Sequence, residues 1–327
     1  MVQSRSVLQL ADSEKLGEFV HSATFFNDVK PRDVLRCALL CAHEGGEMIK
    51  AAIERRGTSE SGHHDSKISA ADLVTETDVA VERMIRSRIS SVFPGHLFVG
   101  EEGTGEPISV EEREGKWVWI VDPIDGTTNF VHAFPVVAVS IAVAFGDDPV
   151  LGVVFNPVTD ELWFSWKGCG AFMKRQDGHV VRIRTSGCTS LGSALVSTGF
   201  AVPFLRRKTE DTAAQEKLLA VVEHNTRVLM RNSRDLRRIG SAACDICFVA
   251  MGRTDVFFEF GIKEWDIAAA LVILHEAGGD SSTVGGMKPF SIRGRNVLVA
   301  ATIALRTEMS TVLTDKDAVS SIEAIEK

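Results

Sequence analysis

The chain begins with stretches in which apolar residues recur at helical spacing. Such spacing runs through residues 31–56 and again through about 77–92, and it predicts two helices joined by a polar loop at 57–67. A short apolar run at 97–99 predicts a strand, and a second polar loop follows at 103–116. The first third of the chain is therefore predicted to be mainly helical.

From residue 117 the apolar positions change to strand spacing. Trp117, Trp119 and Val121 alternate with Val118 and Ile120, which predicts a buried strand. The next apolar runs are separated by turn residues and lie at 136–145, 150–157, 161–166 and 179–184. Short connections between successive strands predict an antiparallel meander.

The last third of the chain alternates between the two patterns. It predicts, in order, a helix at 211–224, a strand at 228–230, a helix from residue 240, a strand at 254–259 and a helix at 265–277. Mixed and alternating elements favour a layered α/β sandwich over an all-parallel sheet. With no repeat or linker, we expect residues 31–327 to form one catalytic domain of two interlocked halves, about 31–190 and 191–327. Residues 1–30 are expected to be a loosely ordered extension or an added helix.

Composition narrows the classes of function. The net charge is −8, and the absence of a long basic run argues against a nucleic-acid surface. No apolar stretch is long enough to cross a membrane. The acidic start resembles neither a secretory signal nor a transit peptide, so we expect six reduced cysteines and a cytoplasmic protein. Cys244 and Cys247 lie in an apolar helical pattern, which favours burial over a redox or zinc pair.

Acidic residues follow the ends of predicted elements. Glu101 and Glu102 end one strand, Asp122 and Asp125 end the next, and Asp266 opens a helix. Each has an ordinary explanation taken singly, namely loop acidity, a turn, or a favourable charge in the first turn of a helix. Gathered in one cleft they would repel one another strongly, and a divalent cation removes that conflict. All-oxygen ligands suit Mg²⁺, with Mn²⁺ as an alternative, better than Zn²⁺.

The residues after Asp125 add an anion site. Residues 126–129 would begin a short helix, whose free N–H groups can bind phosphate. Thr127 is placed to orient a water molecule. Metal ions and a helix N-terminus around one phosphate indicate metal-assisted hydrolysis of a phosphate ester.

Three motifs resemble one known family. They are "GEE" at 100–102, "WVWIVDPIDGTTNFVHAFP" at 117–135 and "EWDIAAALVILHEAGG" at 264–279. They are similar to the inositol monophosphatase family of Mg²⁺-dependent, Li⁺-inhibited sugar phosphatases, and the likeness runs from about residue 31 to 305. The resemblance implies an αβαβα sandwich and a homodimer.

The resemblance also implies a set of metal ligands. Glu101, Asp122 and the backbone carbonyl of Ile124 correspond to ligands of a first ion, and Asp122, Asp125 and Asp266 to those of a second. Glu102 lies beside the first ion and positions a further ion or a water molecule. Two or three Mg²⁺ ions per site are therefore expected.

Catalytic and substrate-binding residues follow from the same motifs. "ADLVTETD" at 71–78 matches the family segment whose last aspartate pairs with the motif threonine, so Asp78 and Thr127 would activate the attacking water. The residues expected to bind substrate are Gly126, Thr127, Thr128, Ser241, Ala242 and Glu259. Among them, Gly126 and Thr127 would hold phosphate through their backbone, and Glu259 would accept hydrogen bonds from inositol hydroxyls.

The expected function is hydrolysis of myo-inositol monophosphate to inositol and phosphate. One alternative keeps the chemistry on another small phosphate ester, either fructose 1,6-bisphosphate or a nucleotide 3′-phosphate. Another is a family member without catalysis that binds a partner. Thr128 favours the sugar-phosphate branch, because the nucleotide-phosphatase branch more often reads "DGTKGF" at this motif.

Overall fold

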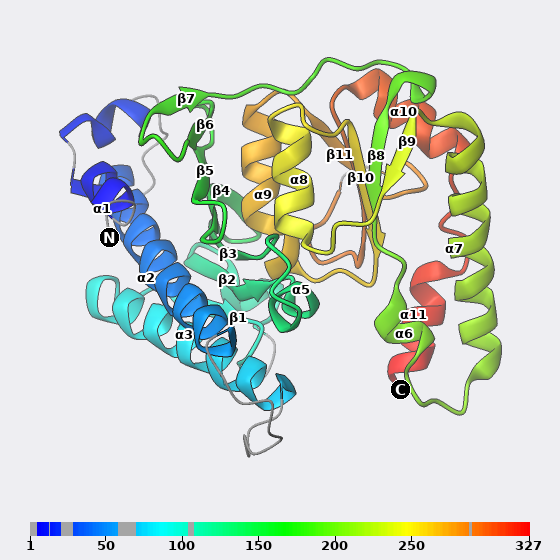
Figure 1. Ribbon diagram of the computed structural model, residues 1–327, viewed down its shortest axis with the longest axis horizontal. Helices are drawn as coiled ribbons and strands as arrows, with labels where there is room; N and C mark the ends of the chain where they lie inside the picture. The colour runs from blue at the N-terminus through cyan, green and yellow to red at the C-terminus, as the bar shows by residue number, and fades with distance from the viewer. Residues whose placement is uncertain (1–4, 13, 21–28, 58–69, 104–107, 288–289) are drawn as a thin grey trace.

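Helical and sheet layers alternate across the molecule (Figure 1). The structure, a computed structural model, describes residues 5–12, 14–20, 29–57, 70–103, 108–287 and 290–327. Helices α2 and α3 cover one face of a first sheet, α8 and α9 lie between that sheet and a second one, and α7, α10 and α11 cover the far face of the second sheet. The predicted αβαβα sandwich is confirmed.

The first sheet has seven strands in the order of the chain. They are β1 (Leu97–Gly100), β2 (Trp117–Asp125), β3 (Ala138–Phe145), β4 (Asp148–Asn156), β5 (Glu161–Trp166), β6 (Ala171–Lys174) and β7 (Val180–Arg182). Strand β1 pairs with β2 in parallel, and every later pair is antiparallel. The predicted meander is confirmed, although the pattern did not separate β6.

The second sheet has five strands in the order β11-β12-β10-β8-β9. Their bounds are β8 (Leu195–Thr198), β9 (Asp235–Arg237), β10 (Val256–Phe260), β11 (Asp280–Ser282) and β12 (Asn296–Ala300). Strand β10 lies at the centre, parallel to β8 and antiparallel to β12. Its neighbours come from distant segments, which is why the chain pattern alone did not define this sheet.

The helices divide between the layers. Those before residue 190 are α1 (Arg5–Asp12), η1 (Glu14–Val20), α2 (Pro31–Gly57), α3 (Ala70–Val92), α4 (Val110–Arg113) and α5 (Thr127–Val131). Those after it are η2 (Leu191–Ser193), α6 (Val202–Leu205), α7 (Thr212–Asn232), α8 (Ala242–Ala250), α9 (Glu264–Glu276), α10 (Ile303–Val312) and α11 (Ala318–Glu326). Among the described residues, none of these helices is long and apolar enough to cross a membrane.

Strand β2 contributes to two cores because successive side chains point to opposite faces of a sheet. Trp119 and Val121 pack with α2 and α3, whereas Val118 and Ile120 pack with α8 and α9. All nine residues of β2 are buried. Its last residues therefore end inside the molecule, between helical layers, and this position brings its aspartates to the site.

Two expectations are corrected. Residues 228–230 are not a strand but part of the continuous helix α7, which buries Leu229 in the core beside the second sheet and leaves Met230 exposed. The expected polar loop at 103–116 contains helix α4, which Ser109 and Glu112 begin with reciprocal side-chain caps. Of the two alternatives given for residues 1–30, the added helix is the one found at residues 5–12, with Val7 and Leu10 buried against α2. The predicted loop at 57–67 lies, apart from Gly57, outside the described residues.

Candidate active site

An irregularity in β2 points two aspartates the same way. Asp122 pairs with Ser140 and Asp125 pairs with Ala138, so β2 has one more residue than β3 between these two pairs. In a regular strand, residues three apart face opposite sides of the sheet. The extra residue is a β-bulge, which re-aims the side chain that follows it. Asp122 and Asp125 consequently face the same space.

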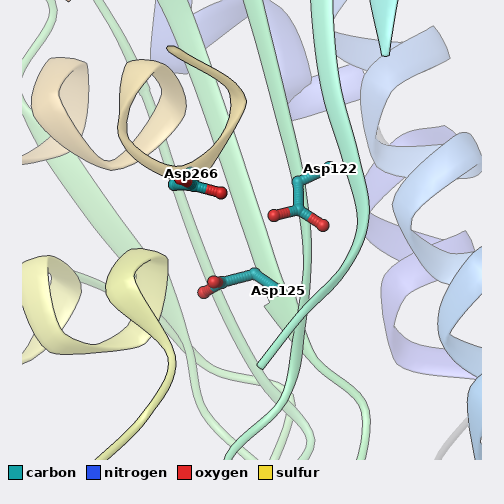
Figure 2. A group of neighbouring side chains, drawn as sticks. All are labelled: Asp122, Asp125 and Asp266. Carbon is teal, nitrogen blue, oxygen red and sulfur yellow. The ribbon is translucent and has the colours of Figure 1, made fainter. Parts of the chain in front are cut away.

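Asp266, in the first turn of α9, completes a cluster with these two residues (Figure 2). One carboxylate oxygen from each of Asp122, Asp125 and Asp266 lies within 4.8 Å of the others. Burial, followed by repulsion from Glu101 and the other acids, raises the pKa of Asp122 well above its usual range. Burial also raises the pKa of Asp125 to about 7 and that of Asp266 to about 6. The three carboxyl groups are thus held so close together, and so far from water, that their ionised forms are destabilised.

Two further acids surround the cluster. Glu101 directly follows β1, and its residue surface is exposed, although its carboxylate lies among the other acids. Loss of hydration, followed by repulsion from Asp266 and Glu102, raises the pKa of Glu101 to about 7. Asp78, on α3, is 3% exposed. Burial and then repulsion from Glu102 and Glu101 raise its pKa to about 8.

The donor set fits a hard divalent cation. Oδ1 of Asp78 and Oδ1 of Asp122 are buried and have no hydrogen-bond partner among the residues that the structure describes. Such atoms are rare in native proteins, because an unpaired buried polar group costs about 1–3 kcal/mol or more. Carboxylate oxygens without sulfur or imidazole favour Mg²⁺ or a similar ion. The cluster therefore has the composition, the burial and the unpaired oxygens of a cation site.

Asp125 is fixed by the start of α8. Ser241 Oγ donates to Oδ2 at 2.5 Å, and the backbone N–H of Ala243 donates to the same oxygen at 2.8 Å. The N–H of Ala242 donates to Oδ1 at 3.2 Å. These bonds favour the anionic form of Asp125 and partly oppose the effect of burial. A helix N-terminus thus holds this carboxylate toward the cluster.

A cavity of about 540 Å³ opens beside the cluster. Among the residues that line it are Glu101, Asp125, Asp266, Ala242, Glu259 and residues 126–129 at the start of α5. Gly126 precedes α5 with a φ of 94°, and a Cβ there would lie 3.1 Å from the carbonyl oxygen of Val136. Glycine is therefore required at this turn. The cavity joins the acids to one helix start, a combination suited to a phosphate group and its counter-cations.

Glu259 projects from β10 into the same cavity. Burial raises its pKa to about 8, and the positive charge of Arg238 opposes that rise. Gly199 leaves room for this side chain, because a Cβ at Gly199 would lie only 1.8 Å from Glu259 Oε1. Glu259 thus lines the same cavity as Asp125 and Asp266 of the acidic cluster.

The remaining predicted residues have identifiable positions. Thr127 Oγ1 lies 3.4 Å from the carbonyl oxygen of Ile124, a long hydrogen bond. The backbone N–H of Glu102 donates to Glu82 at 2.8 Å. Thr128 lines the cavity, whereas Ser241 is 1% exposed and donates its hydroxyl proton to Asp125. The expected ligand and substrate roles of these residues stay predictions.

Two buried acids near the site were not expected from the sequence. Glu82, one turn after Asp78 on α3, is 5% exposed and holds the backbone of Glu102. Its spacing of four residues from Asp78 was the available signal. Asp245, on α8, is 2% exposed, and burial raises its pKa to about 7. It lay within an apolar helical pattern that gave no reason to single it out.

Comparison with known proteins places this site in a family. The sequence model of the inositol monophosphatase family matches residues 30–318. The chain belongs to this family. Inositol monophosphatase 1 of Rattus norvegicus is 37% identical over 270 residues, which span 82% of this chain and 89% of the rat protein. The family assignment accounts for the divalent-metal character of the acidic cluster.

Other relatives broaden the picture. A protein of Pseudomonas aeruginosa named Nus factor SuhB is 36% identical over 264 residues, covering 81% of this chain and 90% of that one. The crystal structure of inositol monophosphatase-II from Staphylococcus aureus superposes with a TM-score of 0.70 at 28% identity, covering 89% and 99% of the two chains. The inositol monophosphatase fold is thus shared over nearly the whole chain.

Proposed function

We propose that this protein is a Mg²⁺-dependent phosphomonoesterase that hydrolyses myo-inositol monophosphate to inositol and phosphate. The observation that carries the proposal is the cluster of Asp122, Asp125 and Asp266, whose oxygens lie within 4.8 Å of one another beside the start of α5. Membership of the inositol monophosphatase family supports the same activity.

The acids provide the metal ligands in this proposal. Glu101, Asp122 and the carbonyl of Ile124 would hold one Mg²⁺, and Asp122, Asp125 and Asp266 a second; Glu102 borders the site for a third ion or a water. When bound, the ions supply Lewis-acid stabilisation of negative charge on the phosphate and the leaving oxygen. Mn²⁺, with similar ligand preferences, is expected to substitute, and Li⁺ to inhibit.

Protein side chains handle the proton in this mechanism. Helix α3, which carries Asp78, packs against α5, which carries Thr127. We infer that the Thr127 hydroxyl orients the attacking water and that Asp78 accepts the proton. A general base must lie within hydrogen-bond reach of the group it deprotonates, directly or through one water.

The substrate is held from two sides. Backbone N–H groups of Gly126 and Thr127 bind the phosphate, and the polar start of α5 at Thr128 widens that surface. Glu259 accepts hydrogen bonds from sugar hydroxyls, with Ser241 and Ala242 forming the adjoining wall. In the metal-free protein a pKa of about 8 keeps Glu259 largely protonated at neutral pH. Bound cations favour its carboxylate form.

The direct test is phosphate release by the purified protein. Inositol 1-phosphate is compared with fructose 1,6-bisphosphate and 3′-phosphoadenosine 5′-phosphate, each with Mg²⁺, with EDTA and with added Li⁺. The proposal predicts Mg²⁺-dependent, Li⁺-sensitive turnover that is fastest on inositol 1-phosphate. Faster turnover of another ester would refute the substrate assignment and retain the metal site. If the protein hydrolyses none of these esters, the proposed enzymatic activity is refuted, and the alternative of a family member that binds a partner is favoured.

Arg238 favours a second candidate substrate class. It lines the same cavity as Glu259, and its positive charge opposes the rise in the pKa of Glu259 that burial causes. A cation at this point can accept a second anionic group, as in a sugar bisphosphate or a nucleotide. Replacing Arg238 with methionine would reduce kcat/KM for the bisphosphate and leave that for inositol 1-phosphate nearly unchanged. Equal effects on both substrates would remove this candidate.

Four broader expectations accompany the proposal. The substrate partner is a small phosphate ester rather than a nucleic acid, in keeping with the net charge of −8. A homodimer and a cytoplasmic location are expected from the family resemblance and the six free cysteines. We also keep the division into an extension at 1–30 and one domain at 31–327 as a proposal.

A further inference from the structure

Arg113 is a buried cation at the end of α4. Its side chain is 1% exposed, and its guanidinium donates two hydrogen bonds to Glu264, each at 2.7 Å. One of the same nitrogens lies 3.1 Å from Asp147 Oδ1. A two-pronged pair between arginine and carboxylate fixes orientation as well as distance. Arg113 and Glu264 are therefore held rigidly with respect to each other.

Glu264 occupies a sensitive position. It is the first residue of α9, and Asp266, one of the three clustered aspartates, comes two residues later in the same turn. Asp266 itself accepts a hydrogen bond from the backbone N–H of Lys263 at 2.6 Å. A shift of Glu264 would consequently move the turn that aims the Asp266 carboxylate.

The other end of the pair belongs to the segment that enters β2. The N–H of Lys116 donates to the carbonyl of Arg113 at 2.9 Å, and β2 begins at the next residue, Trp117. Strand β2 carries Asp122 and Asp125. The Arg113–Glu264 pair therefore ties together the two segments that supply the cluster.

The pair lies behind one wall of the cavity beside the acidic cluster. Glu101 and Trp265 line both the 540 Å³ cavity and a neighbouring one of about 800 Å³, so they form the partition between the two. Arg113 and Glu264 line only the second cavity. Arg113 thus lies outside the substrate cavity, and its influence on the site must pass through α9.

A contribution to folding stability does not by itself account for a buried ion pair of this kind. Taking two charges out of water offsets much of their attraction, and apolar replacements of buried ion pairs are often neutral or stabilising. A buried pair that orients a neighbouring ligand has a separate effect, since groups supporting metal ligands typically change metal affinity about 10- to 100-fold. The geometry favours this second role.

We propose that Arg113 is a positioning residue that fixes Asp266 for divalent-cation binding through its pair with Glu264. The inference rests on the proposed metal site, but not on the identity of the phosphate ester. It concerns a residue whose guanidinium bonds Glu264 and Asp147, which are not members of the cluster, and it predicts an effect on cation affinity rather than on substrate affinity.

The test compares four variants of the full chain with the parent. The single variants are Arg113→Met and Arg113→Lys, and the double variant is Arg113→Met with Glu264→Met, which leaves neither charge of the pair buried alone. The matched control is Lys174→Met with Asp160→Asn. Lys174, on β6, is fully buried and donates to both carboxylate oxygens of Asp160 at 3.0 Å. Asp160 lies in the turn between β4 and β5.

Mg²⁺ and Mn²⁺ binding is measured by calorimetry, with the Mg²⁺ dependence of turnover and the substrate KM in parallel. The double variant is expected to fold and to bind Mg²⁺ at least about tenfold more weakly, with the ester KM at saturating Mg²⁺ nearly unchanged. The Lys variant, which keeps the charge but loses the two-pronged geometry, should fall between the double variant and the parent. The control should stay within about twofold of the parent.

A folded double variant with parental Mg²⁺ affinity would overturn the proposal, as would an equal loss in the control. If Arg113→Met does not fold, the double variant still decides. A parent that binds cations but hydrolyses no ester would refute the proposed function alone, because the affinity ratio between variants remains measurable. A parent that binds neither Mg²⁺ nor Mn²⁺ would overturn the metal site and the role of Arg113 together.

Discussion

Ser241 Oγ donates a 2.5 Å hydrogen bond to Asp125 Oδ2 and so joins the end of β2 to the start of α8. The same hydroxyl oxygen accepts from the N–H of Cys244 at 3.3 Å, which makes Ser241 the N-cap of α8. One side chain therefore satisfies a helix terminus and orients a member of the acidic cluster. Its loss should affect both stability and cation binding.

Replacing Ser241 with alanine should lower the free energy of unfolding by about 2 kcal/mol, because a cap and a bond to a charged group are lost together. Mg²⁺ affinity should fall as well. Urea denaturation and calorimetry measure the two effects. The comparison is Thr302→Ala, which removes the N-cap of α10 and a bond to the carbonyl of Cys188. Equal Mg²⁺ affinities in the two variants would contradict the role assigned to Ser241.

Asp266→Asn should reduce turnover by at least about 100-fold while the fold is retained, because the carboxylate charge serves the cation. An amide oxygen can still accept the hydrogen bond from Lys263, so α9 should start normally. The control is Asp211→Asn, at a residue that accepts a similar bond from Ala214 at the start of α7. Normal phosphate release by Asp266→Asn would exclude this residue as a metal ligand.

The metal-free protein should lose stability as pH rises from about 5 to 8. Four carboxyl groups have pKa values above the usual range, and burial is the largest cause for each. The pKa is about 8 for Asp78, about 7 for Glu101 and Asp125, and about 6 for Asp266. The folded state therefore binds more protons than the unfolded state in this window, and the unfolding free energy falls with pH.

Thermal unfolding in EDTA and in Mg²⁺ across this pH range measures the effect. The Tm in EDTA should fall with pH, and the increase in Tm caused by Mg²⁺ should grow, because cations compete with protons for the same oxygens. Asp122→Asn should flatten the EDTA curve by removing one repelling charge. A Mg²⁺ effect that is constant with pH would contradict this account of the cluster.

Gly199→Ala should displace Glu259, since the added Cβ would lie 1.8 Å from Oε1. We expect kcat/KM for the sugar phosphate to fall about 10- to 100-fold, as misplacement of a substrate-orienting group by about 1 Å can do. Steady-state kinetics on inositol 1-phosphate provide the measurement. Gly95→Ala is the matched control, because no atom of the described residues lies within 4 Å of its Cβ position. Unchanged kinetics in Gly199→Ala would remove Glu259 from the substrate site.

The first half of the fold was predictable because its order in space follows its order in sequence. Strands β2 to β7 pair with their neighbours along the chain, so alternation and turn residues were sufficient. The second sheet was less predictable, since β10 lies between β8 and β12, which are distant in sequence. The apolar run at 228–230 by itself predicts a strand, but these residues belong to the helical periodicity of α7, which decides their conformation.

The candidate site was predictable as a set of residues and not as a geometry. Motifs at strand and helix ends indicated Asp122, Asp125 and Asp266, and these three converge. Glu82 and Asp245 carried no motif, and their positions follow from helix packing. Arg113 lies in a stretch expected to be a loop, and its partner Glu264 is 151 residues further along the chain. Such a contact leaves no local pattern.

The sequence by itself determined the local elements: the buried alternation of β2, the helical spacing of α2 and α9, and the acids at the ends of β1 and β2. Only the tertiary structure decided that the bulge after Asp122 turns Asp125 to the same side and that α8 and α9 begin beside it. Local preferences depend on neighbours in the chain, whereas this convergence depends on two sheets packing against one helical layer. The chain thus specifies its acids locally, and the packing of distant layers makes them one site.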